Sequence, residues 1–198
     1  NGSHSALAYL GGLAGYKTVA AAMQDAGLAQ FVRALMGDAA DTLAMPAGVG
    51  LDDYMQSLLR RFGNVSLNHL TAQIAMDGSQ KLPQRILEPI RLRLARGLPI
   101  DHHALVVAAW IRYLMGRDEQ HGVLAINDPL ADELAQALGR VGTQADDLVA
   151  AVLGFAQVFG RDLPGNPVFV RSVAHALQNL LSQGVRATLS ALASARSQ

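Results

Sequence analysis

The stretch Gln-Ile-Ala-Met-Asp-Gly-Ser-Gln-Lys-Leu-Pro-Gln-Arg, residues 73–85, predicts a helix that ends and a second helix that begins at once. Asp77 ends an amphipathic run, Gly78 tolerates the left-handed turn that stops a helix, and Ser79 has a side chain suited to capping the next helix. The sequence on both sides of this joint has the periodicity of helices. The geometry of the joint therefore decides how the two halves of the chain pack together.

Lys81 is the residue of this stretch that stability alone does not explain. Pro83 falls in the first turn after Ser79, where a missing N–H is tolerated, so Lys81 is held near a helix N-terminus. A cation there opposes the helix dipole. We therefore consider two interpretations: a solvated lysine in a loop, or a lysine placed for binding.

Composition bounds the class of protein. The chain has 198 residues, of which 51% are hydrophobic and 16% charged. Such a length can bury about 70% of the unfolded surface, which is enough for one domain core. The 16 basic and 16 acidic side chains balance, so neither nucleic acid nor an anionic membrane is an expected partner.

The sequence also indicates the compartment. It contains no cysteine, which excludes disulfides and a thiolate zinc site and fits a reducing cytoplasm. No apolar run reaches the length of a membrane span, and no secretory signal pattern is present. We expect a cytoplasmic protein.

Hydrophobic periodicity predicts helices throughout and no strand, so the predicted fold class is all-α. The expected helical ranges are 4–16, 18–43, 51–62, 66–77, the segment from 79 onward, 101–115, 130–138, 146–159 and 166–193, with a loop over 44–50 and another over 116–129.

Local signals refine these ranges. Gly27 divides the second helical range, and Ser66 and Asp101 are expected N-caps. Pro89 predicts a kink or restart near Glu88, because it removes an interior hydrogen bond.

The last helix is expected to begin at Asn166 and Pro167, an N-cap with proline at the first helical position. Its apolar residues recur at helical spacing and should face the core. They are Val170, Val173, Leu177, Leu180 and Leu181.

His69, Gln73 and Asp77 follow one another at steps of four, which predicts a polar stripe on one helix face. A wet surface explains this stripe, and a metal site is poorly supported because His69 and Asp77 would lie about 12 Å apart along the axis. His102 and His103 project in different directions and indicate a helix start. We expect no metal.

Arg91, Arg93 and Arg96 form a basic run after Pro89. Aromatic side chains for base stacking are missing there, so we expect a solvated face.

Three segments together resemble one family: Asn1 to Gly11, residues 73–85, and Trp110 to Gln120. The chain resembles the polyol-specific long-chain dehydrogenases, the family of mannitol 2-dehydrogenase and fructuronate reductase, and is most similar to the fructuronate reductase branch. The Asp-Gly-Ser-Gln-Lys-Leu-Pro-Gln-Arg run is a specific signal, whereas the Asn-x-x-His pair alone is weak.

The resemblance implies that residues 1–198 are one C-terminal substrate-binding domain, a helical bundle similar to that of 6-phosphogluconate dehydrogenase. It also implies an NAD-binding, Rossmann-type N-terminal domain. The sequence holds no Gly-x-Gly-x-x-Gly motif of its own, so no residue is assigned to the cofactor. Because the sequence begins at Asn1, inside what resembles a family motif, we expect it to be part of a longer protein.

The resemblance implies a role for Asn1, His4, Lys81 and Gln73, and the role of Arg85 is inferred from its position. Asn1 would donate to the reacting oxygen and His4 would position that oxygen or the base, a lysine expected five residues before Asn1. Lys81 and Gln73 would contact substrate, and Arg85, one turn after Lys81, is a candidate for a uronate carboxylate. From residue type alone, a helix cap and an edge histidine are the simpler interpretations of Asn1 and His4.

Three functions remain open. The first is NAD-dependent interconversion of D-fructuronate and D-mannonate, for which this chain alone should be inactive. The second is a mannitol or other polyol dehydrogenase; mannitol dehydrogenases tend to carry a basic residue at the position of Gln73, which disfavours it. The third is a helical interaction module without chemistry. The enzymatic functions predict that Asn1, His4 and Lys81 converge on one polar wall, whereas the module predicts that they scatter.

Overall fold

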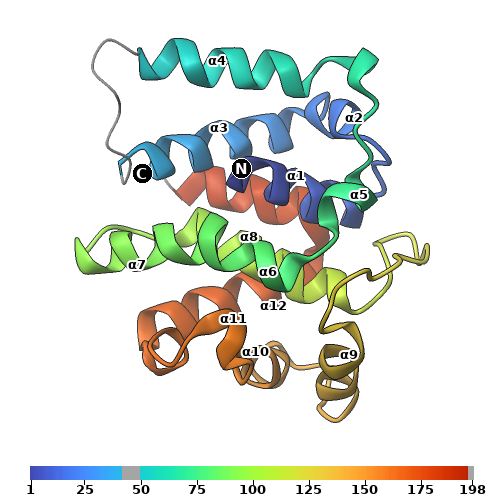
Figure 1. The fold of residues 1–198 in the computed structure, drawn as a ribbon, viewed down its shortest axis with the longest axis vertical. Coiled ribbons are helices and arrows are strands. Elements are labelled where there is room, and N and C mark those ends of the chain that lie inside the picture. Colours follow the sequence, from blue (N-terminus) through green and yellow to red (C-terminus); the bar gives the residue numbers. More distant parts are fainter. Residues whose placement is uncertain (42–49, 196–198) are drawn as a thin grey trace.

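A computed structural model describes residues 1–41 and 50–195, and in this part of the chain it contains helices and no strand, which confirms the predicted all-α class (Figure 1). The α-helices are α1 Gly2–Leu13, α2 Val19–Met23, α3 Ala26–Ala40, α4 Leu51–Phe62, α5 Thr71–Ala75, α6 Gly78–Leu82, α7 Glu88–Ala95, α8 Asp101–Leu114, α9 Ala131–Gly139, α10 Ala145–Leu153, α11 Ala156–Phe159 and α12 Pro167–Ala195. Shorter turns are the 3₁₀-helices η1 Val65–Leu67 and η3 Leu163–Gly165 and the π-helix η2 Pro83–Leu87.

Helix α8 is the centre of the molecule. Nearly all of its residues are buried, and α1, α3 and α12 pack against it. Figure 1 shows α4 at one end of the long axis and α9 to α11 at the other. Among the described helices, none combines the length and the apolar character needed to cross a membrane.

Helix α12 begins as predicted, because the Asn166 side chain accepts hydrogen bonds from the N–H groups of Val168 and Phe169. The sequence pattern did not indicate the break inside it. Gly184 has φ 77°, and the next N–H, that of Val185, donates to the carboxylate of Glu119 at 2.5 Å. A carboxylate from a distant loop therefore starts the second half of the helix.

The joint at residue 77 is built differently from the prediction. Asp77 itself takes the left-handed conformation (φ 55°), and Gly78 is already the first residue of α6. Asp77 can hold this conformation because its N–H donates to the carbonyl of Asn127 at 2.9 Å. Ser79 is not a cap: its N–H and hydroxyl both donate to the carboxylate of Asp128, at 2.7 and 2.5 Å. A loop residue therefore caps α6.

Gly78 is required for a different reason, which is space. A Cβ atom there would lie within 3 Å of the indole Nε1 of Trp110 and the hydroxyl of Tyr9, both on buried side chains. We expect Gly78→Ala to lower the free energy of unfolding by about 1–3 kcal/mol through overpacking. Gly37→Ala is the matched control: a Cβ there meets nothing within 4 Å, so alanine should stabilise α3 by up to about 1 kcal/mol. Urea unfolding followed by fluorescence of Trp110, the only tryptophan, measures both; equal effects would contradict the packing argument.

Helix α7 begins at Glu88, where the sequence predicts a kink or restart, but the backbone stays helical through this point. Glu88 has helical angles (φ −64°, ψ −48°), and its N–H bonds to the carbonyl of Pro83. That five-residue spacing is the hydrogen bond of a π-helix. Segments α6, η2 and α7 therefore form one continuous helical path, in which a widened turn accommodates Pro83 and Pro89.

Two predicted boundaries in the first half of the chain are wrong. The break after α2 lies at Asp25, whose carboxylate caps α3 through the N–H groups of Gly27 and Leu28, so Gly27 is inside the helix. Asn64, not Ser66, supplies the cap that follows α4, and it caps only the short η1.

Two further boundary predictions concern loops and helix starts. Asp101 is the first residue of α8, and no side chain caps that helix. The predicted loop over 44–50 lies outside the described residues except for Gly50.

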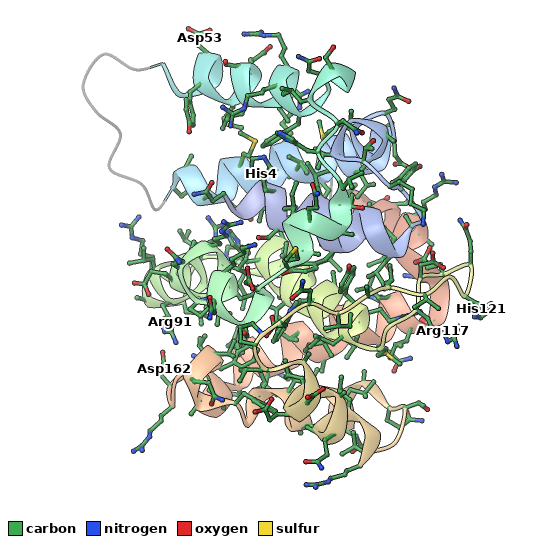
Figure 2. All side chains as sticks on the ribbon, turned by 45° about the vertical axis from the view of Figure 1, so that its right-hand side comes forward. His4, Asp53, Arg91, Arg117, His121 and Asp162 are labelled. Atoms are coloured by element: carbon green, nitrogen blue, oxygen red, sulfur yellow. The ribbon has the colours of Figure 1, made fainter. Side chains whose placement is uncertain are left out.

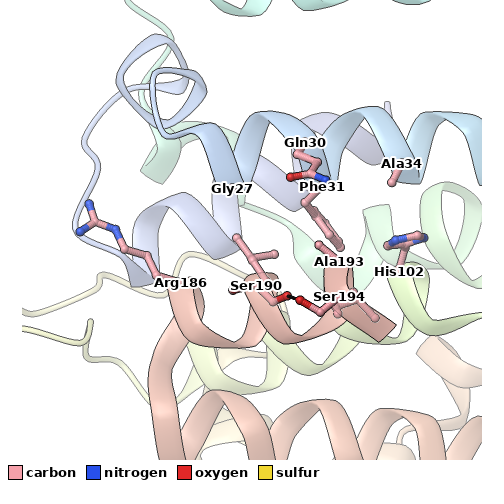
Figure 3. Close-up of a pocket in the computed structure, with 11 residues that line it drawn as sticks. Gly27, Gln30, Phe31, Ala34, His102, Arg186, Ser190, Ala193 and Ser194 are labelled. Atoms are coloured by element: carbon pink, nitrogen blue, oxygen red, sulfur yellow. Dashed lines mark hydrogen bonds between the residues drawn. The ribbon is translucent and has the colours of Figure 1, made fainter. Parts of the chain in front are cut away.

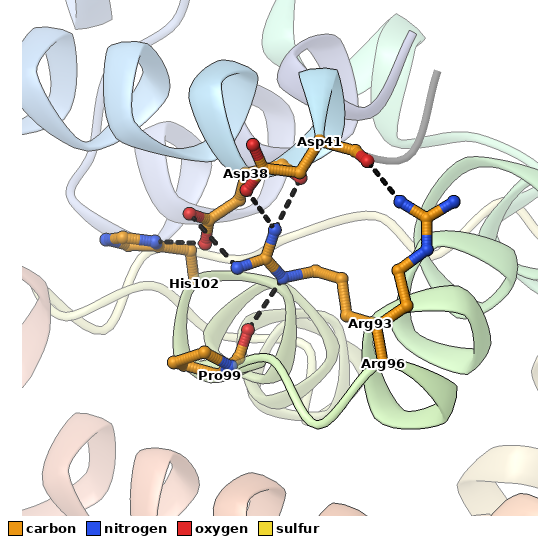
Figure 4. Close-up of polar contacts among 6 residues, drawn as sticks. All are labelled: Asp38, Asp41, Arg93, Arg96, Pro99 and His102. Atoms are coloured by element: carbon orange, nitrogen blue, oxygen red, sulfur yellow. Dashed lines mark hydrogen bonds and ion pairs between the residues drawn. The ribbon is translucent and has the colours of Figure 1, made fainter. Parts of the chain in front are cut away.

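Arg93 is not on a solvated face, which corrects the prediction for the basic run. Its side chain is 3% exposed and donates to the carbonyls of Pro99 and Asp38, both at 2.6 Å. It also forms ion pairs with Asp38 at 3.5 Å and with Asp41 at 2.9 Å. Figure 4 shows the guanidinium held between α3 and the segment that leads into α8.

The other members of the basic run also bind partners. Arg96 donates to the carbonyl of Asp41, and Arg91 forms an ion pair with Asp162 at 2.7 Å. The arginine holds the pKa of the Asp162 carboxyl at about 2. Arg93 departs from the prediction most strongly, because its side chain is buried.

His102 and His103 lie in the first turn of α8, as predicted, and both are buried. His102 Nδ1 lies 2.7 Å from the carboxylate of Asp38. His103 Nδ1 is fully buried and has no hydrogen-bond partner among the described residues. Burial lowers the pKa of His103 to about 4, and the charge of Arg93 acts in the same direction.

His103 therefore predicts acid sensitivity. Its pKa is lower in the folded chain than its ordinary value of 6.5, so its contribution to stability is present above pH 6.5 and is lost as the pH falls towards 4. We expect the free energy of unfolding to fall by about 2 kcal/mol more between pH 7 and pH 5 in the wild type than in His103→Leu. Urea unfolding at the two pH values measures this; equal losses in both proteins would contradict it.

Candidate active site

An open depression of about 370 Å³ lies where the start of α1 meets α5 and α6. It contains all five residues that the sequence analysis singled out, together with two others. The lining residues are Asn1, His4, His69, Gln73, Ile74, Lys81 and Arg85. Residues that are up to 84 positions apart in sequence therefore share one wall, which is the arrangement that the enzymatic functions predict.

Asn1 and His4 come from the first turn of α1. Asn1 stands at the N-cap position, but its side chain makes no capping hydrogen bond. The simpler interpretation, in which Asn1 is a helix cap, therefore does not hold. The amide of Asn1 remains available to a ligand in the depression.

His4 is half buried and fixed by an aromatic neighbour. Its ring lies edge-on to Phe62, with 4.4 Å between centroids and 72° between planes. Burial is the main cause that lowers the pKa of His4 to about 4, and the charges of Arg61 and Arg85 act in the same direction. The imidazole is therefore neutral at pH 7, so it can donate from one nitrogen and accept at the other.

The surroundings of Lys81 account for a cation close to the start of a helix. Its Nζ donates to the carbonyl of Met76 at 2.5 Å and lies 3.8 Å from the carboxylate of Asp77. Both acceptors belong to the left-handed turn before α6, so the turn that sequence reasoning identified positions the lysine. The amine is partly exposed, and the residue lines the depression.

Arg85 lies one turn further along the same helical path, in η2. In the described part of the chain its side chain makes one hydrogen bond, a long one of 3.4 Å to the hydroxyl of Ser5, and it has no carboxylate partner. A guanidinium has five donors. Most of the N–H donors of Arg85 therefore remain free to bind a ligand in the depression.

The predicted helical stripe of His69, Gln73 and Asp77 does not form. Helix α5 covers only Thr71–Ala75, so His69 lies before it and Asp77 lies in the turn after it. His69 and Gln73 nevertheless both line the depression, while the carboxylate of Asp77 faces Lys81. His69 is the polar lining residue that sequence reasoning missed as a site residue, because its wet-surface pattern carried no signal of function.

The chemistry of the wall is donor-rich. None of its lining residues is a carboxylate, whereas Lys81 and Arg85 are cations and Asn1, Gln73 and two histidines offer N–H groups. Such a set suits a ligand with hydroxyl groups and a negative charge. In the described residues, no group of three acidic or histidine side chains is placed to hold a metal ion.

Size alone does not identify this site. A larger cavity, of about 430 Å³, lies between α3 and the end of α12 and is lined by Gln30, Phe31, His102 and Ser190 among others (Figure 3). Arg186 at its edge is bound to Asp25 and Tyr16. This cavity contains none of the predicted site residues.

Comparison with known proteins gives the family. The family model for the mannitol dehydrogenase C-terminal domain matches residues 1–181, and the chain belongs to this family. D-mannonate oxidoreductase of Escherichia coli (strain K12) is 46% identical over 193 residues, which is 97% of this chain and 39% of that protein. Mannitol 2-dehydrogenase of Phaeosphaeria nodorum is 35% identical, over 96% of this chain and 32% of that protein.

Solved structures agree with this assignment. A Pseudomonas fluorescens mannitol 2-dehydrogenase, in a ternary complex with NAD and D-mannitol, matches with a TM-score of 0.92 and 34% identity, over 98% of this chain and 39% of that one. D-sorbitol dehydrogenase in substrate-free form matches with a TM-score of 0.85 and 26% identity. The chain spans about two-fifths of the length of the first of these relatives.

Proposed function

We propose that residues 1–198 are the substrate-binding domain of a cytoplasmic, NAD-dependent oxidoreductase that interconverts D-fructuronate and D-mannonate. The observation that carries this proposal is the wall on which Asn1, His4, Lys81 and Arg85 meet without any carboxylate. The similarity to D-mannonate oxidoreductase, at 46% identity, supports the choice of a sugar acid. A module without chemistry gives no reason for these side chains to converge.

Asn1 and His4 are proposed to act on the reacting oxygen. During reduction of the ketone, negative charge develops on this oxygen, and the amide N–H of Asn1 stabilises it by a hydrogen bond that strengthens in the transition state. His4 is neutral at pH 7, so it orients the oxygen by a second hydrogen bond without competing for the proton. The proton would come from a lysine, which the family resemblance implies five residues before Asn1.

Arg85, Lys81 and Gln73 are proposed to bind the rest of the substrate. Arg85 has unused donors and no carboxylate partner in the described chain, which suits a bidentate bond to the substrate carboxylate. Lys81 is fixed by the carbonyl of Met76 and has donors left for substrate hydroxyl groups. An uncharged Gln73 at the edge of the wall donates to, or accepts from, a further hydroxyl group.

NAD is the proposed cofactor, since a mannitol 2-dehydrogenase of the same fold forms a complex with it. When bound, it supplies or accepts the hydride. The donor-rich depression suits a substrate better than a dinucleotide, so we assign NAD binding to a Rossmann-type domain that precedes residue 1. On this basis residues 1–198 alone should show no NAD-dependent turnover.

The alternative substrate is mannitol, which the solved mannitol 2-dehydrogenase complex makes a specific candidate. The test is turnover by the full-length protein under NADH at neutral pH, comparing D-fructuronate with D-fructose. A strong preference for D-fructuronate is expected, because only that substrate has a carboxylate for Arg85. Preference for D-fructose would favour the mannitol assignment, and turnover of neither would overturn both.

A further inference from the structure

His69 is the polar lining residue of the depression that the proposed function leaves without a role. Its side chain is exposed and, in the described part of the chain, makes no hydrogen bond or ion pair. Its imidazole therefore makes no polar contact that stabilises the described fold. It lines the depression together with His4 and Gln73.

The backbone around His69 is fastened on both sides. The carbonyl of His69 accepts a hydrogen bond from the N–H of Val19 at 2.9 Å. Two residues later, the N–H of Thr71 donates to Lys17 at 3.0 Å, and its hydroxyl donates to Tyr16 at 2.8 Å. A side chain on such a segment is held in place before a ligand arrives, which lowers the entropy cost of binding.

The residue before it is strained. Asn68 has φ 23° and ψ 42°, a positive φ that is uncommon for a residue other than glycine. Strained residues of this kind persist where the surrounding bonds over-determine the backbone, and they cluster at ligand-binding positions. This turn separates His69 from α5, yet His69 and Gln73 both line the depression.

The charges on the wall place His69 near the reacting centre. Arg85 and His69 both lie close enough to His4 to contribute to the lowering of its pKa. They come from different elements, Arg85 from η2 and His69 from the segment between η1 and α5. A substrate whose reacting oxygen is held by Asn1 and His4 therefore has donors from two different elements, Arg85 and His69, on the same wall.

We propose that His69 binds the substrate by donating a hydrogen bond to its terminal hydroxymethyl group, at the end away from Arg85. The inference rests on the proposed function, and its chemistry follows from the substrate. The ketone of D-fructuronate is next to its hydroxymethyl group, and its carboxylate is at the opposite end of the carbon chain. With the carboxylate on Arg85, the hydroxymethyl group extends beyond Asn1 and His4.

The experiment compares two substrates with four variants of the full-length enzyme. D-fructose shares the hydroxymethyl ketone end with D-fructuronate but lacks the carboxylate. We expect His69→Ala to raise the KM for D-fructuronate, and the KM or inhibition constant of D-fructose, by the same factor of about 3 to 10, with kcat within about twofold. His69→Gln, which retains a donor, should recover most of the loss.

Arg85→Ala and His175→Ala complete the comparison. Arg85→Ala should raise the KM for D-fructuronate by about 10- to 100-fold and change the constant for D-fructose little, because an ion-paired hydrogen bond is stronger. His175 is an exposed histidine outside the depression, bonded to Asn179, so His175→Ala should change neither constant. The midpoint of thermal unfolding should be unchanged in His69→Ala.

Each outcome decides one question. If the wild type does not turn over D-fructuronate, the proposed function fails. This result comes from the wild type alone and is therefore distinct from any result with the variants. If the wild type is active but His69→Ala leaves KM unchanged, the inference about His69 is overturned. An effect confined to D-fructuronate would also overturn it, since His69 would then bind the carboxylate.

Discussion

Replacing Asn1 with alanine in the full-length enzyme is expected to lower kcat for D-fructuronate by about 100- to 1,000-fold, the usual effect of removing one donor to a developing oxyanion. KM should change little, because this hydrogen bond strengthens in the transition state rather than in the bound substrate. The structure supports a role outside the fold, since the side chain of Asn1 makes no capping bond. Steady-state kinetics with NADH at neutral pH measures the change.

Two controls separate chemistry from folding in this experiment. Asn179→Ala removes an exposed amide whose hydrogen-bond partner is His175, far from the depression in sequence, and should leave kcat unchanged. The thermal midpoint of Asn1→Ala should match that of the wild type, because no bond within the fold is lost. A rise in KM at constant kcat would instead mean that Asn1 binds substrate without acting on the reacting oxygen.

The helical fold follows from periodicity, and most of it was predictable. Helices α3, α8 and α12 bury the apolar faces that the sequence pattern indicates, and Asn166 caps α12 as expected. Boundaries failed where a distant partner decides the local conformation. Asp128, which is 49 positions away from Ser79, caps α6, and Glu119 supports the start of the second half of α12. Neighbouring residues carry no trace of either contact.

The candidate site was predictable for a different reason. Asn1, His4, Gln73 and Lys81 were identified through resemblance to a family, whereas Arg85 was identified by its position one turn after Lys81. The roles of all five remain predictions. The structure adds that they share one wall. Sequence patterns did not reveal that the donors of Arg85 are available. Only the fold shows that no carboxylate of the described residues pairs with its guanidinium.

Arg93 gives the largest expected effect on stability. We expect Arg93→Ala to lower the free energy of unfolding by about 3–5 kcal/mol, because it breaks a buried ion pair by removing one partner. The carboxylate of Asp38 would stay buried with His102 but without the guanidinium, and the carbonyls of Pro99 and Asp38 would lose their donors. Urea unfolding of this chain at pH 7, followed by the fluorescence of Trp110, measures the loss.

Arg91→Ala is the matched control, two positions away on the same helix. Arg91 also pairs with a carboxylate, at 2.7 Å, but its partner Asp162 is 56% exposed (Figure 2). A pair in water contributes about 0–1 kcal/mol, so Arg91→Ala should cost at most about 1 kcal/mol. Asp41 is as exposed as Asp162, so the two arginines differ in their own burial, 3% exposed for Arg93 against 28% for Arg91, and in the buried second partner of Arg93, Asp38. The comparison therefore measures the effect of burial. Equal losses would mean that the buried cluster between α3 and α7 does not hold the two helices together.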